Sequence, residues 1–159
     1  MTGILITFNL ASAVFLVYVL IQGILMIDPS AIRFHIIMAL SSTALCVFAH
    51  CLTMMYVVAV GRMIREAVEK KVLDQSYVSQ TKSYRKSIFR AATIGMLSVM
   101  TQTILGGGVH TGLLSPAFHL ALGLFAVSIS GYATFLEIRY LIANHLLGHR
   151  VAHEYEKAG

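Results

Sequence analysis

Histidine offers the most chemistry in this chain, whose 159 residues include seven of them. Four lie in or at the edge of long apolar stretches, namely His35, His50, His110 and His119. A polar group inside a membrane is costly unless it has a partner, and imidazole is a common ligand of metal ions and haem iron. These four side chains are therefore the first candidates for a binding site.

Three of the four histidines, His35, His110 and His119, are expected near one outer surface, at similar depth. Three imidazoles at one depth could coordinate a metal ion. Alternatively, His35 and His119 could supply both axial ligands of a haem b, with His110 as a substitute. A simpler interpretation also stays open, in which each histidine hydrogen-bonds lipid headgroups or loop carbonyls.

His50 is expected about 22 Å farther in than His35, at 1.5 Å per helical residue. It is the candidate for a second site, although no histidine is found opposite it at that depth. The absence of a second ligand disfavours a full di-haem arrangement. A hydrogen bond to Gln102 or Ser98 across a helical bundle would satisfy His50 instead.

A second histidine cluster lies near the C-terminus, where His145, His149 and His153 repeat every four residues. Two histidines at i and i+4 on a helix can share a zinc or copper ion. Gly148 weakens that helix, and no further ligand is evident at a suitable spacing. An amphipathic tail that lies on the membrane or on a partner is the alternative.

No catalytic signature accompanies these histidines. The chain has no Walker loop, nucleophile elbow, H-E-x-x-H motif or paired intramembrane carboxylates. Glu137 is the only acid within an apolar stretch, and we expect it at the cytoplasmic boundary near Arg139. The sequence therefore favours a protein that is not an enzyme, and it carries no sign of nucleic-acid binding.

The elements that must position the histidines follow from composition. Apolar residues make up 57% of the chain and charged residues 12%, against roughly 25% charged residues in soluble domains. This excludes a soluble enzyme and a disordered chain. It predicts a single all-α membrane domain with four transmembrane helices, because four apolar stretches reach the required length of about 20 residues. These spans are expected at about 3–27, 34–60, 88–105 and 116–136.

The distribution of Lys and Arg predicts the orientation of the four spans. Segment 61–87 and its flank carry most of them, the C-terminal segment 137–159 carries three, and the opposite side carries only Arg33. Positive residues concentrate on the cytoplasmic side. We therefore expect both termini in the cytoplasm of a bacterial-type inner membrane, with the basic segments against the anionic inner leaflet.

Short connections predict an antiparallel four-helix bundle. Asp28-Pro29-Ser30 is expected to form a tight turn, Gly106–Gly108 to end the third span, and Ser115-Pro116 to start the fourth. The second and fourth spans would then be diagonal partners. Segment 61–87 is predicted to be a basic helical connection with Asp74 as a helix N-cap, and 137–159 an amphipathic tail.

Two classes of function remain open. The first is a small integral membrane subunit without catalysis of its own, which packs into a homo-oligomer or a larger membrane complex. The second is a subunit that binds haem b or a metal ion for electron transfer or quinol chemistry, with ligands from the outer histidines. An absorbance spectrum of the purified protein distinguishes the two.

Overall fold

The computed structural model describes residues 1–25, 31–71 and 73–157, and these are almost entirely helical. The four helices are α1 (Thr2–Leu25), α2 (Ile32–Lys71), α3 (Ser76–His110) and α4 (Pro116–Lys157). Each contains a stretch long and apolar enough to cross a membrane. The prediction of an all-α chain with four such helices is confirmed.

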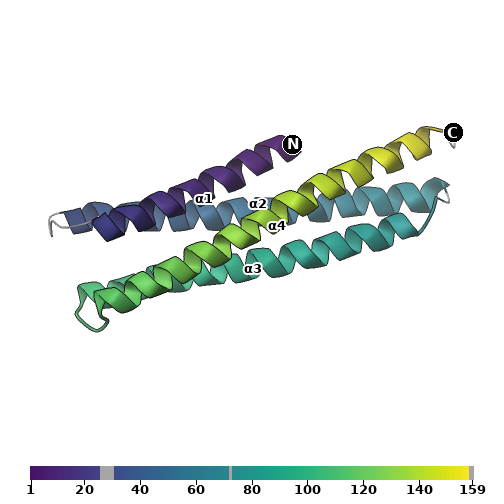
Figure 1. Ribbon diagram of the computed structural model, residues 1–159. Helices are drawn as coiled ribbons and strands as arrows, with labels where there is room; N and C mark the ends of the chain where they lie inside the picture. Colours follow the sequence, from purple (N-terminus) through teal and green to yellow (C-terminus); the bar gives the residue numbers. More distant parts are fainter. Residues whose placement is uncertain (26–30, 72, 158–159) are drawn as a thin grey trace.

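The helices lie side by side in an arrangement compatible with a helical bundle (Figure 1). α2 and α4 contact each other across the centre, whereas the described backbones of α1 and α3 do not approach each other closely. We call the end at which α2 and α4 begin the histidine end, and the end at which α2 stops and α3 begins the basic end. α1 starts part-way along the bundle, so only α2, α3 and α4 reach the basic end (Figure 1).

The connection at the histidine end differs from the expectation. α3 does not end at the glycine run: it continues through Gly106–Gly108, and His110 is its last residue rather than a loop residue. The last carbonyls of the helix have partners, because Gly107 accepts a hydrogen bond from the backbone N–H of Thr111 and Gly108 accepts from those of Leu113 and Leu114. The chain then reverses at Gly112, whose φ of 74° favours glycine. The turn predicted at Asp28-Pro29-Ser30 lies outside the described residues.

At the basic end, α2 passes through Gly61 without a break and stops at Lys71. Asp74 was expected as the N-cap of the next helix, but the cap position belongs to Gln75, which makes no side-chain cap bond. Asp74 still satisfies the helix start, because its carboxylate accepts a 2.8 Å hydrogen bond from the backbone N–H of Ser76.

The interior alternates between apolar and polar layers along the bundle axis. On α2 the buried positions Cys46, His50, Thr53 and Val57 follow at spacings of four, three and four residues, as in left-handed helix packing. One apolar layer contains Leu16, Cys46 and Val99, and the next contains Leu5, Val57, Ile88 and Leu141. A polar layer separates them and includes His50, so the fold holds this histidine between two apolar layers.

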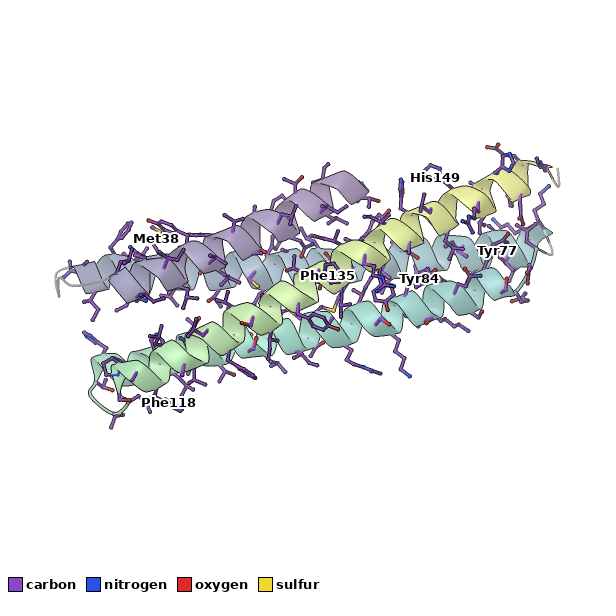
Figure 2. The ribbon with its side chains drawn as sticks, in the orientation of Figure 1. Met38, Tyr77, Tyr84, Phe118, Phe135 and His149 are labelled. Atoms are coloured by element: carbon purple, nitrogen blue, oxygen red, sulfur yellow. The ribbon has the colours of Figure 1, made fainter. Side chains whose placement is uncertain are left out.

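The outside of the apolar spans carries large hydrophobic side chains. Leu97, Phe125 and Phe135 are each more than half exposed, and Figure 2 shows Phe135 on the outside of α4. Four apolar helices with such a surface are consistent with a multi-pass membrane protein, because lipid tails would cover it.

Candidate functional site

The histidine end places His35 of α2 directly against Gly23 of α1. A Cβ atom at Gly23 would lie 2.9 Å from Cε1 and 3.5 Å from Nε2 of the imidazole. Real Cβ contacts are not that short, so only glycine allows the ring to rest at this position. His35 is half-buried, and its buried Nδ1 has no hydrogen-bond partner among the described residues.

His119 of α4 has the same relationship to Gly106 of α3. A Cβ atom at Gly106 would lie 2.9 Å from Cε1, 3.5 Å from Nε2 and 3.7 Å from Nδ1 of His119. The corresponding distances from Gly23 to His35 are also 2.9, 3.5 and 3.7 Å. Each helical hairpin therefore presents one imidazole, seated in the same way on a glycine of the preceding helix.

The two histidines also occupy equivalent places in their own helices. His35 is the fourth residue of α2, which starts at Ile32, and His119 is the fourth residue of α4, which starts at Pro116. Each follows a phenylalanine, Phe34 or Phe118, that is about half exposed (48% and 49%). Figure 2 shows Phe118 at the histidine end, beside the turn between α3 and α4.

Gln102 of α3 holds His119 from the interior side. Its amide Nε2 lies 3.1 Å from Nδ1 of His119, and it donates to the backbone carbonyl of the same residue at 3.1 Å. Gln102 Oε1 is buried without a hydrogen-bond partner among the described residues, as is Gln22 Oε1 of α1. The histidine end thus contains one imidazole, that of His35, and two amides with an unpaired buried atom.

The other predicted ligands do not join this pair. His110 is exposed at the last position of α3, and no three His, Cys, Asp or Glu side chains of residues 1–25, 31–71 and 73–157 are grouped to hold a metal ion. In the tail, the Nε2 atoms of His145 and His149 lie 3.3 Å apart, and both residues are exposed. Metal binding at either place stays a prediction without a preassembled set of three ligands.

His50 lies in the polar layer and is bonded to Glu137 of α4, not to Gln102 or Ser98 as the sequence suggested. Its Nδ1 lies 2.7 Å from Glu137 Oε1, and both side chains have zero exposure. Gly95 of α3 makes room for the ring, because a Cβ atom there would lie 3.3 Å from His50 Nε2 and 3.0 Å from Ala133 Cβ.

Two further side chains extend this polar layer toward α1. Asn9 donates its amide to Thr53 Oγ1 at 2.8 Å, and Thr53 donates in turn to the carbonyl of Ala49. Four polar atoms of the layer have no partner among the described residues: Asn9 Oδ1, His50 Nε2, Thr134 Oγ1 and Glu137 Oε2. Buried groups of this kind are normally paired with protein or water, so the layer has capacity for a water molecule.

The bond between Glu137 and His50 was not expected from the sequence, which suggested Gln102 or Ser98 as the partner of His50. The signal that could have found it is the register of α2 and α4, which run in the same direction. Glu137 follows His119 by 18 residues and His50 follows His35 by 15. Counted from the two outer histidines, Glu137 and His50 therefore differ in depth by about one helical turn, a difference that the long glutamate side chain can span.

No family model matches the chain, and the searches of curated proteins and of solved structures likewise found no match.

Proposed function

We propose that this chain is a membrane subunit that binds one haem b between His35 and His119 and serves in electron transfer or quinol chemistry. The observation that carries the proposal is the repeated seating of an imidazole on a glycine, His35 on Gly23 and His119 on Gly106, with the same three distances. Two histidines from different helices are a common way to hold a haem inside a bundle.

The support for such a group at the histidine end is the origin and pairing of the two rings. The rings come from α2 and α4, the two helices that meet across the bundle, and no competing carboxylate or amine pairs with either ring in the described part of the chain. Each ring fills the space beside a glycine of the preceding helix, where a larger residue would clash with it. When bound, haem iron supplies one-electron oxidation and reduction.

The chain's own side chains orient the ligands and limit access. Gln102 fixes the ring of His119 through contacts to both the side chain and the backbone carbonyl. The layer of Leu16, Cys46 and Val99 then separates the histidine end from His50 and Glu137. This apolar layer excludes water from the inner side of the site, which favours electron transfer without side reactions.

The test is the reduced-minus-oxidised absorbance spectrum of the protein purified in detergent. We expect a Soret and an α band that are lost in His35→Ala and in His119→Ala. His110→Ala is the matched control, because His110 lies at the same end but is exposed, and it should keep the band. Bands that survive both ligand substitutions would show that the wrong histidines were chosen.

A subunit without a cofactor, which packs into a homo-oligomer or a larger membrane complex, is the second candidate. The observation in its favour is a groove of about 530 Å³ between α2 and α4 at the basic end. It begins where α1 starts, since Thr2 Oγ1 lies 2.9 Å from Tyr56 Oη, and it is lined by small residues such as Ala67, Gly148 and Ala152. Such residues allow close helix approach.

The oligomer is tested by the mass of the particle in mild detergent. A homo-oligomer that uses this groove should dissociate when Ala152→Trp fills it. A particle of unchanged mass, or a monomeric wild-type protein, contradicts self-association through this face.

The orientation proposed for the membrane is that of the basic end in the cytoplasm of a bacterial-type inner membrane. Its support is the charge asymmetry, since the histidine end carries Arg33 alone. Single cysteines at Arg33 and at Lys86, introduced after Cys46 and Cys51 have been replaced by alanine, should differ in labelling by an impermeant reagent in intact cells. The cysteine at Arg33 should react first.

A further inference from the structure

A second groove lies between α2 and α3 at the basic end, where the apolar spans stop. Its volume is about 160 Å³. Gly61 of α2 and Thr81 of α3 meet in it, because a Cβ atom at Gly61 would lie 3.5 Å from Thr81 Oγ1. Val58 and Val78 complete its apolar lining.

Four cationic side chains line this groove: Arg62 and Arg65 from α2, and Lys82 and Arg85 from α3. On each helix the two are three residues apart, so they lie on one face. We call these four the basic groove residues. All four are exposed, and none forms an ion pair or hydrogen bond with another described residue.

No acidic residue lines this groove, and in the described part of the chain none forms an ion pair with the basic groove residues. The nearest acids along α2 are Glu66 and Glu69, four residues after Arg62 and Arg65, and Glu66 lines the separate groove between α2 and α4. Four unpaired positive charges held close together repel one another, and a bound anion relieves that repulsion. Guanidinium groups also bind phosphate oxygens with two parallel hydrogen bonds, which gives this face a preference for phosphate.

The depth of the groove indicates where the phosphate comes from. The apolar part of α3 begins at about Ile88, one turn after Arg85, and the apolar part of α2 ends at about Val60, just before Arg62. The basic groove residues are thus at the level of the lipid headgroups. Basic pockets between transmembrane helices at this depth bind anionic lipid headgroups.

We propose that the basic groove residues form a specific binding site for an anionic glycerophospholipid, with its phosphate groups between α2 and α3. A headgroup with two phosphates suits the groove best, because each helix provides one pair of cations. This goes beyond general attraction to an anionic leaflet, since it assigns one groove and four side chains. It is also independent of haem binding, which concerns the opposite end of the bundle.

The experiment is native mass spectrometry of the full chain in detergent, titrated with diphosphatidylglycerol, phosphatidylglycerol, phosphatidylcholine or inorganic phosphate. Lys82→Gln/Arg85→Gln should lower the affinity for diphosphatidylglycerol by at least about tenfold, because two of the four cations that line the groove can no longer form charge-assisted hydrogen bonds with the phosphate oxygens. Arg62→Gln/Arg65→Gln, which removes the two cations of α2, should lower the affinity for diphosphatidylglycerol by a similar factor. All of these are exposed positions, where substitutions have little effect on stability.

The matched control is Lys86→Gln/Arg90→Gln, which removes two charges from the same helix at nearly the same depth. Neither Lys86 nor Arg90 lines the groove, and both are exposed, so affinity should change by less than about twofold. Equal losses in the groove and control variants would mean that only overall charge matters, and would overturn the site. Displacement of the lipid by an equal concentration of inorganic phosphate would overturn the lipid as its ligand.

Discussion

His50 and Glu137 are hydrogen-bonded at 2.7 Å in the interior of the bundle, and neither side chain is exposed. The two residues are 87 positions apart in sequence and belong to α2 and α4, the helices that meet across the centre. A polar pair in an apolar setting has few alternative partners. It therefore fixes the depth of α4 relative to α2, and with it the relative depth of His119 and His35.

Removing one member of this pair should be strongly destabilising. Glu137→Ala leaves His50 buried without a partner, and breaking a buried pair in this way costs about 3–5 kcal/mol. The double variant His50→Leu/Glu137→Leu removes both polar groups and should regain most of that stability. Denaturant unfolding in detergent measures the stability of the single and the double variant. A single variant as stable as the wild type would contradict a structural role for the pair.

Gly95 should be intolerant of even a methyl group. Its added Cβ would lie 3.0 Å from Ala133 Cβ and 3.3 Å from His50 Nε2, and overpacking of this kind costs about 1–3 kcal/mol. Gly131→Ala is the control, because nothing lies within 4 Å of its added Cβ. That change should be neutral or slightly stabilising, since alanine favours helix over glycine. Thermal unfolding measures the stability of both variants. Equal losses of stability in Gly95→Ala and Gly131→Ala would argue against close packing at Gly95.

If His119 is a haem ligand as proposed, Gly106→Ala should disturb haem binding although it replaces neither proposed ligand. The added Cβ forces the His119 ring, 2.9 Å away, to move by several tenths of an ångström, and binding constellations tolerate only about 0.5 Å. We expect a lower haem content and an altered α band. Gly107→Ala is the neighbouring control, with nothing within 4 Å. If the two variants give the same spectrum, Gly106 does not seat the ligand.

The contact between Tyr77 and Glu154 predicts an alkaline transition at the basic end, where Figure 2 shows Tyr77 near the start of α3. The Tyr77 hydroxyl donates a hydrogen bond to Glu154, and this bond raises the pKa of Tyr77 above its ordinary value, which is about 10. A raised folded-state pKa stabilises the contact below pH about 10, and the effect is lost as pH rises through the folded pKa.

Tyrosinate absorbance tests this directly. The titration of Tyr77→Phe, subtracted from that of the wild type, should leave a component that ionises above the ordinary range. Glu154→Gln should move that component to lower pH, because it removes the negative charge of Glu154. A component that ionises at or below the ordinary value would contradict the bond.

The sequence allowed the helices to be predicted because their signal is local. Four apolar stretches of sufficient length are visible without tertiary information, and they correspond to α1–α4. The end of α3 was wrong because glycine in a helix is only mildly unfavourable, and a glycine run inside an apolar stretch does not stop a helix unless the backbone bonds find other partners. Gly106 lies inside the helix, where the ring of His119 packs against it.

Only part of the candidate site could be predicted from the sequence, because its other features are contacts between helices. His35 and His119 could be selected by residue type and depth. The contacts of His35 with Gly23 and of His119 with Gly106 could not be predicted, since they depend on how the two helices of each hairpin are rotated and staggered. The bond between His50 and Glu137 could not be predicted for a related reason: it joins residues 87 positions apart on two helices, and it depends on how these helices are staggered.

The most direct test of the central claim is the haem content of the full chain, expressed with haem available and purified in detergent. We expect one haem b per chain, bound with two histidine ligands and lost when His35 or His119 is replaced by alanine. Protein that is folded and helical but contains no haem, even after incubation with added hemin, would contradict the account.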